Sequence, residues 1–342
     1  MKERYIYIDR LKGFTIFLVV LGHIIPVLID DKAAHSNELF LFIYSFHMPL
    51  FFFLSGYIAF KTIKIESLKN YFQFIKSKSV SLLIPMLTWP LIKQYCFTSK
   101  IDFSFETFYS IILEEITNPG LWFLRMLFFF LIVYSIFHIA SERFNKKRLL
   151  IFDLVIIIID IAFFLLFCYL IQLEAIFHHL FYFIFLMIGV FLSKYDFLKT
   201  IITNKVVVSL SLLFFIVSVG HYNDLIYLID SSQNKILKFF ISVFAIIIFY
   251  HIAKKISLSN WLDNSICFLG RKSLVIYVTH FLFLSILSKS MLLPFDISFF
   301  FLALIAVPLS LIMIYFCILI SKVIELFPIF NFLLYGVRIK NK

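Results

Sequence analysis

Charged residues are scarce in this chain of 342 residues. Asp, Glu, Lys and Arg make up only 15% of it, whereas 62% of the residues are hydrophobic and 20% are aromatic. Soluble domains are roughly half apolar, so this composition excludes a soluble globular fold. Together with the mean hydropathy of +1.01, it predicts an integral membrane protein.

Glycine, proline and cysteine are also few. Only 8 Gly and 8 Pro are present, and no low-complexity linker interrupts the chain. We therefore expect a single integral-membrane domain over residues 1–342. No two of the 4 cysteines stand at metal or redox spacing, so we expect them to be packing residues; they are Cys96, Cys168, Cys267 and Cys317.

Long apolar runs separated by short charged joints fill the chain. A helix needs about 17 to 25 apolar residues to cross the hydrocarbon of a bilayer. The predicted fold class is therefore all-α, a polytopic membrane protein with about ten transmembrane helices. The expected spans are Gly13–Ile29, Leu39–Phe60, Val80–Phe97, Leu121–Ile139, Leu149–Leu170, Ile176–Leu192, Val206–Gly220, Ile236–Ala253, Ser273–Leu293 and Ile297–Ile320.

The formal net charge of +11 indicates an orientation in the membrane. If the N-terminus is cytoplasmic, 24 of the 31 Lys and Arg residues fall in inner joints or termini, and the outer joints are rich in Asp and Glu. The positive-inside rule then predicts cytoplasmic N- and C-termini. A nucleic-acid partner is not expected, because it would require a basic face on a soluble fold. No small-x-small cleavage site follows the first span, which we expect to be retained.

Ionisable residues inside predicted spans are expensive in lipid and are expected to face the bundle interior or a water-filled cavity. They are His23, His47, Lys93, Arg125, Asp153, Asp160 and His280. Asp153 is close enough to the inner end of its span to reach headgroups. Asp160 lies about 10 Å deeper and requires a partner such as Lys93 or Arg125.

The stretch "IDRLKGFTIFLVVLGH" carries Asp9 and Lys12 at one end and His23 at the other. Lys12 and His23 are eleven residues apart, which returns a helix to within about 20° of the same face. Their axial separation of roughly 16 Å places Lys12 at the cytoplasmic boundary and His23 past the middle of the membrane. Asp9 can pair with Lys12 three residues later, whereas Arg10 points the other way.

The stretch "SFHMPLFFFLSGY" carries His47, followed by Pro49, Ser55 and Gly56. Pro49 is expected to kink the second span near the histidine, and Ser55 and Gly56 permit close helix approach. His47 is at a depth comparable to that of His23, so the two imidazoles are predicted to line one cavity. A single intramembrane His is more often structural than catalytic, but a neutral imidazole in a pair can act as a general base.

These two stretches resemble the opening of the acyltransferase 3 family. The resemblance continues in "LLIPML", "GLWFLRMLFFF" and "LGRKSLVIYVTH", in the family's order and over most of the chain. It implies a ten-span bacterial inner-membrane enzyme that O-acylates carbohydrates, commonly with acetyl-CoA as the acyl donor and without a metal. Lys12 stands where many members have Arg. In having lysine there, the chain resembles the subgroup of fucose acetylases and surface-polysaccharide O-acetyltransferases.

The resemblance assigns the catalytic role to His23, with His47 as a second candidate. It implies transfer of an acyl group to a hydroxyl of a cell-surface carbohydrate such as O-antigen, capsule or exopolysaccharide. The residues expected to bind the carbohydrate or the acyl-CoA are Asp9, Lys12, Ser55, Trp122, Arg125, Tyr277 and His280. For Trp122 and Arg125 the alternative is an interfacial Trp with a snorkelling Arg. The cations expected to meet the CoA phosphates, or only to enforce topology, are Lys76, Lys78, Arg143, Lys146, Lys147, Arg148, Arg271 and Lys272.

Two other classes of protein remain open at this point. Intramembrane His and carboxylate residues also suit a proton-coupled exporter of polysaccharide or lipid-linked sugar. The chain shows no pair of broken helices at corresponding positions of two halves, a feature of many such carriers. A membrane sensor or scaffold leaves the two histidines at matched depth unexplained.

Overall fold

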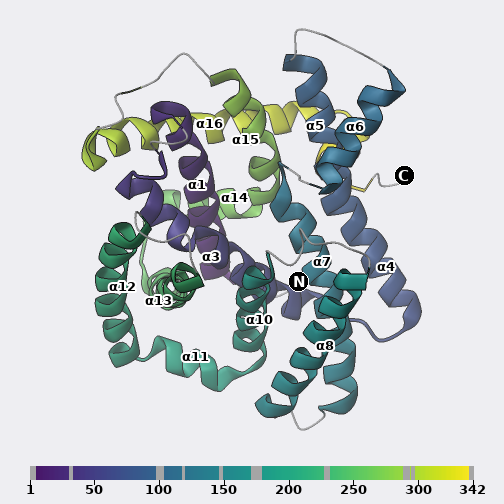
Figure 1. Cartoon of the computed structure of the whole chain (residues 1–342), viewed down its shortest axis with the longest axis vertical. Coiled ribbons are helices and arrows are strands. Elements are labelled where there is room, and N and C mark those ends of the chain that lie inside the picture. Colours follow the sequence, from purple (N-terminus) through teal and green to yellow (C-terminus); the bar gives the residue numbers. More distant parts are fainter. Residues whose placement is uncertain are drawn as a thin grey trace. The chain divides into compact units, whose positions relative to one another are not determined.

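Helices make up every regular element of the part of the chain that the structure describes (Figure 1). This computed structural model describes residues 5–30, 34–97, 104–117, 120–145, 149–170, 179–226, 232–287, 293 and 297–338. In hydrocarbon, backbone N–H and C=O groups must be satisfied within their own segment, which an α-helix does. The predicted all-α class is confirmed.

Six described helices are long and apolar enough to cross a membrane, or eight if each of two bent helix pairs is one span. The single helices are α1 (Ile6–Ile29), α3 (Glu38–Thr62), α7 (Trp122–Phe144), α8 (Leu150–Leu170), α13 (Ser232–Lys255) and α16 (Phe299–Glu325). The bent pairs are α10 (Leu180–Lys194) with α11 (Asp196–Thr203), at 104°, and α14 (Asn260–Arg271) with α15 (Ser273–Leu287), at 77°.

Two predicted spans correspond to shorter apolar helices. Residues 80–97 lie in the π-helix η1 (Ser79–Leu83) and in α5 (Ile84–Phe97), which has 14 residues. The apolar part of α12 (Lys205–Ile226) is Lys205–Gly220. The sixth predicted span begins at residues outside the described part, and α10 covers the rest. The multi-pass prediction is confirmed, while the orientation stays a prediction.

The chain separates into two compact units. The first contains Met1–Leu54 and Asp196–Val323, and the second contains Ser55–Tyr195 and Ile324–Lys342. The remaining helices, α4 (Leu68–Lys78), α6 (Phe105–Thr117) and α17 (Pro328–Tyr335), belong to the second unit. The single domain expected over residues 1–342 stays a prediction.

In the first unit, α1 crosses α14 with almost no space between the two backbones. A Cβ atom at Gly13 would lie 2.1 Å from the Ile266 carbonyl oxygen, and one at Gly270 would lie 2.0 Å from the Asp9 carbonyl oxygen. Only glycine fits at either position, which fixes where α14 sits along α1. In the same unit α12 runs beside α13 (Figure 1).

In the second unit, α7 packs against α8, and α17 packs against α5. The indole Nε1 of Trp89 on α5 donates to the Leu334 carbonyl at 2.8 Å, which anchors α17. The outer side chains of α8 are apolar and exposed, Ile151 and Phe163 among them, at 69% and 67%. Such a surface is stable only in contact with lipid or another apolar partner.

A buried ion pair corrects the prediction for Asp153. Its side chain is 0% exposed rather than solvated by headgroups, and Lys194 Nζ lies 2.6 Å from Asp153 Oδ2. Tyr195 donates to the same carboxylate at 2.6 Å, Ser141 at 2.7 Å and Asn145 at 2.8 Å. The cause is packing: the first turn of α8 meets the last turns of α7 and α10 instead of the membrane surface.

The prediction that Lys93 or Arg125 pairs with Asp160 is wrong within the described chain. Asp160 is 8% exposed, and its Oδ2 has no hydrogen-bond partner among the described residues. Lys93 is exposed on α5, whereas Arg125 is 6% exposed on α7. Cys168, Cys267 and Cys317 are free and buried, as expected of packing residues, and the side chain of Cys96 lies outside the described part.

Candidate active site

Three histidines gather in the first unit, on three different helices. The rings of His23 on α1 and His280 on α15 have centroids 5.2 Å apart. His47 on α3 reaches this pair through Tyr44, whose ring centroid is 4.7 Å from that of His47 and 6.5 Å from that of His23. The sequence predicted a pair of His23 and His47, but the nearer partner of His23 is His280.

Backbone carbonyls fix the tautomers of two of these imidazoles. His47 Nδ1 lies 2.8 Å from the Ile43 carbonyl oxygen, and His280 Nδ1 lies 2.6 Å from that of Tyr277. Because a carbonyl only accepts, each Nδ1 must carry the hydrogen, which leaves the lone pair on Nε2. The buried Nε2 of His280 has no hydrogen-bond partner among the described residues. It is an available acceptor.

His23 differs from the other two histidines in its exposure and bonding. His47 is 3% exposed and His280 is 0% exposed, whereas His23 is half-buried. No hydrogen bond within the described chain involves the His23 ring, so neither of its nitrogens is committed. An accessible and uncommitted imidazole beside a fixed acceptor has the properties of a proton-transferring group.

Pro49 explains how α3 is held beside α13. A proline has no N–H, so Pro49 cannot donate to the Ser45 carbonyl four residues earlier in the helix. The hydroxyl of Ser242 on α13 lies 2.9 Å from that carbonyl oxygen and 2.7 Å from the Lys238 carbonyl oxygen. The Ser45 carbonyl, two residues before His47, is thus within hydrogen-bond distance of a hydroxyl donor on the neighbouring helix in place of the missing N–H.

Aromatic side chains enclose the His23 and His280 pair. The ring of Phe281 has its centroid 5.2 Å from that of His23, and Tyr277, 2% exposed, has its centroid 5.8 Å from that of His280. A Cβ atom at Gly22 would lie 3.0 Å from the Tyr44 ring. The glycine before His23 therefore leaves room for Tyr44 against α1.

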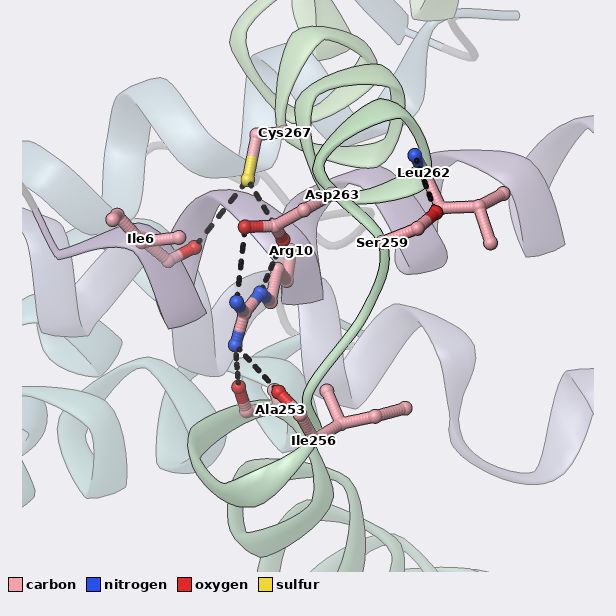
Figure 2. Close-up of polar contacts among 8 residues, drawn as sticks. All are labelled: Ile6, Arg10, Ala253, Ile256, Ser259, Leu262, Asp263 and Cys267. Carbon is pink, nitrogen blue, oxygen red and sulfur yellow. Dashed lines mark hydrogen bonds and ion pairs between the residues drawn. The ribbon is translucent and has the colours of Figure 1, made fainter.

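Arg10, which was expected to point away from Asp9 and Lys12, anchors the beginning of α1. Its guanidinium forms an ion pair with Asp263 on α14, and Nη2 lies 3.0 Å from Asp263 Oδ2. Nη1 donates to the carbonyls of Ala253, at 2.9 Å, and Ile256, at 3.2 Å (Figure 2). A planar guanidinium can make these bonds at once, so Arg10 joins α1 to both α13 and α14.

The other predicted binding residues of the first unit lie at the start of α1. Asp9 and Lys12 are half-buried in its first turns, and Lys12 lies three turns of helix before His23. The uninterrupted helix Ile6–Ile29 keeps Lys12 and His23 on one stripe, as predicted. Ser55 is half-buried on the part of α3 that belongs to the second unit.

An aromatic cluster surrounds Trp122 in the second unit. Its ring centroid is 5.0 Å from that of His179, with the two planes 16° apart, and 5.3 Å from that of Tyr182. Trp122 is half-buried, and Arg125 is buried one turn further along α7. The sequence pointed to Trp122 and Arg125 but not to the two aromatic partners, His179 and Tyr182, which lie at the N-terminus of α10.

The predicted CoA-binding cations differ in their surroundings. Lys76, Arg143 and Arg271 are exposed, whereas Lys146, Lys147 and Arg148 lie outside the described residues. Lys78 is half-buried at the start of η1, 5.8 Å from the Phe74 ring, and burial lowers the pKa of its ammonium group. π-Helices are rare and frequently occur at functional sites.

Lys238 belongs to the same region as the histidines, and sequence reasoning missed it. It is half-buried in the first turns of α13 and close enough to His47 for the two groups to interact electrostatically. Lys238 lies only two residues inside the predicted span Ile236–Ala253, so its position is that expected of a residue at the outer membrane boundary. In the described chain, no group of three or more His, Cys, Asp or Glu residues has the arrangement of a metal site.

These features define a multi-pass helical membrane protein in which three imidazoles lie close together in the first unit. The family model described as an acyltransferase domain, that of the acyltransferase 3 family, matches residues 5–322, and the chain belongs to this family. The resemblance noted in the sequence is thus confirmed.

Two curated relatives match a shorter stretch of 89 residues. Nodulation protein NolL of Sinorhizobium fredii (strain NBRC 101917 / NGR234) is 42% identical over 25% of this chain and 24% of its own length. Nodulation protein NolL of Mesorhizobium japonicum (strain LMG 29417 / CECT 9101 / MAFF 303099) is 37% identical over 25% and 23%. The chain thus matches about a quarter of the length of these relatives. No solved structure matches it significantly.

Proposed function

We propose that this protein transfers an acetyl group from acetyl-CoA to a hydroxyl of a cell-surface carbohydrate such as O-antigen, capsule or exopolysaccharide. The observation that carries the proposal is the pairing of His23 with His280 at 5.2 Å between ring centroids, in a chain of an acyltransferase family. Acyl transfer to a hydroxyl requires a base that removes one proton and later returns it. An imidazole performs both steps near neutral pH.

His23 is the proposed base. It takes the proton of the acceptor hydroxyl while that oxygen attacks the acyl carbonyl carbon of the thioester. The carbon–sulfur bond then breaks, and the thiolate of CoA takes the proton from His23, which leaves an O-acetyl ester, free CoA thiol and neutral His23. The lone pair on His280 Nε2 can accept a hydrogen bond from protonated His23 and so stabilise the charged intermediate state.

His47 has a supporting role in this scheme. The sequence suggested it as the partner of His23, but His280 takes that place. Tyr44 stands between the two rings, with its centroid 4.7 Å from His47. We propose that His47 and Tyr44 hold the acceptor, together with Tyr277. A direct transfer and a covalent acyl-histidine step are both compatible with the chemistry of His23.

The acyl donor is proposed to meet the cytoplasmic face. CoA carries several phosphate charges, and Lys12, Lys78 and Lys272 are cations of the joints and termini that the positive-inside rule assigns to the cytoplasm. Asp9 orients the first turn of α1 beside Lys12. The proposed location is the bacterial inner membrane, with both termini in the cytoplasm.

Carbohydrate binding is proposed at Trp122 and Arg125. Aromatic faces stack on sugar rings, and a guanidinium donates to hydroxyl groups. His179 and Tyr182 extend this aromatic surface, since both of their rings contact Trp122. Ser55, which is half-buried, is a further proposed hydrogen-bonding residue.

An exporter of polysaccharide or lipid-linked sugar is the rival function. Asp160 Oδ2 inside α8, which has no hydrogen-bond partner in the described part of the chain, favours it, because proton-coupled carriers use buried carboxylates. Mass spectrometry of surface glycans from strains with and without the gene separates the two. We expect the glycan to reach the surface in both strains and to be lighter by one acetyl group without the gene. Loss of the whole glycan from the surface would instead establish the exporter.

A further inference from the structure

Lys238 is a cation inside a membrane helix that the proposed mechanism does not use. It lies in the first turns of α13 and is half-buried. Within the described residues, its ammonium group forms neither an ion pair nor a hydrogen bond. A charge held in this way inside a span is costly and usually marks a binding or transport role.

Helix register aligns Lys238 with the histidine cluster. Ser242, four residues after Lys238 and on the same face of α13, bonds to the Ser45 carbonyl of α3 at 2.9 Å. His47 follows Ser45 by two residues. The backbone of Lys238 therefore lies one helical turn from the point where α13 contacts α3.

The charge of Lys238 acts on one end of the cluster. It is close enough to His47 to interact with it electrostatically, and the contact of Ser242 with Ser45 places α13 beside the helix of His47, whereas His23 and His280 lie on α1 and α15. The ammonium is thus offset from the proposed proton-transferring pair. An anion held there is part of the bound acceptor and not the oxygen that becomes negative during the reaction.

We propose that Lys238 binds an anionic substituent of the acceptor, a carboxylate or a phosphate, so that this protein acetylates an acidic glycan. The inference rests on the proposed function, since it concerns the acceptor of the same site. A bound anion compensates the half-buried ammonium, and the unbound lysine is long enough to reach the headgroup region with its charged end. A neutral acceptor leaves the ammonium without a partner.

The acceptor glycan extracted from a strain that lacks the gene provides the test. Membranes containing the protein are supplied with radiolabelled acetyl-CoA and with this glycan in three forms: untreated, with its carboxyl groups reduced to hydroxymethyl groups, or with its phosphates removed by hydrofluoric acid. We expect one of the two treatments to lower the initial rate at subsaturating glycan about tenfold or more, the loss typical of one charge-assisted hydrogen bond. The effective treatment tells carboxylate from phosphate.

Variants of α13 complete the experiment. Lys238→Met should transfer acetyl groups to treated and untreated glycan at the same low rate, the rate of the unmodified protein with the treated glycan. Lys238→Arg should keep the preference for untreated glycan. Lys235→Met, at an exposed lysine of the same helix, is the matched control and should behave as the unmodified protein. Amounts in the membrane are compared by immunoblot.

Two results would overturn the inference in distinguishable ways. If the intact protein acetylates the untreated and both treated glycans at equal rates, the acidic acceptor is refuted while the proposed acetyl transfer stands. If the intact protein transfers no acetyl group to any form, the proposed function fails and the inference fails with it. Because these results come from the intact protein, they hold even if Lys238→Met does not fold.

Discussion

Replacing Lys194 by methionine should destabilise the second unit strongly, because it leaves a buried carboxylate without its countercharge. The Lys194 and Asp153 side chains are 2% and 0% exposed. Methionine keeps most of the length and apolar volume of the lysine stem. The substitution therefore removes the charge and little of the packing.

The expected cost follows from what remains around Asp153. Tyr195, Ser141 and Asn145 still donate to its oxygens, but none supplies a positive charge. Breaking a buried pair costs about 3 to 5 kcal/mol, and the three remaining donors favour the lower end. At about 2 °C per kcal/mol for a chain of this size, Tm should fall by about 6 to 10 °C.

Thermal unfolding of the purified protein in detergent micelles measures this cost. Lys199→Met is the matched control, because Lys199 pairs with an Asp196 side chain that is 92% exposed, and such surface pairs contribute about 0 to 1 kcal/mol. Adding Asp153→Asn to Lys194→Met should restore part of the lost stability. Equal Tm values for Lys194→Met and Lys199→Met would show that the buried ion pair stabilises the protein no more than the exposed one.

Three further substitutions test the contacts that hold the first unit together, two of them by Tm in the same micelles and one by the yield of folded protein. Ser242→Ala should cost about 1 to 3 kcal/mol, because it leaves the Ser45 carbonyl without a donor beside Pro49; an unchanged Tm would show that this bond adds nothing. Gly270→Ala should prevent the normal crossing of α1 and α14 and lower the yield of folded protein. The control Gly220→Ala, with no atom within 4 Å of the added carbon, should be neutral or stabilising. Similar yields of the two variants would contradict this. Arg10→Lys should lower Tm although it keeps the charge, because an ammonium cannot make all the bonds of the guanidinium, and full retention would show that charge alone suffices.

Much of the architecture is readable from the sequence because lipid imposes strict rules. Apolar runs of span length must be helices, since nothing else satisfies the backbone in hydrocarbon. The same rules made His23 and His47 conspicuous, and helical periodicity placed Lys12 on the stripe of His23. These inferences depend on residues within one helix.

The contacts between helices were not predictable in the same way. Asp153 was expected at the headgroups and is instead buried against Lys194, because the sequence does not state which ends of α7, α8 and α10 meet. The pairing of His23 with His280 likewise depends on α1 meeting α15, more than 250 residues apart. One signal was nevertheless present: Pro49 has no N–H, so the Ser45 carbonyl four residues earlier required a donor from outside its own helix.

Complementation with a His23 variant shows whether His23 transfers the proton in the proposed acetylation of a surface glycan. A strain lacking the gene is complemented with the unmodified protein or with His23→Ala at equal amounts in the membrane, and the acetyl content of its surface glycan is measured by mass spectrometry. We expect the unmodified protein to restore one acetyl group and His23→Ala to restore none. Acetylation by His23→Ala at the level of the unmodified protein would contradict it.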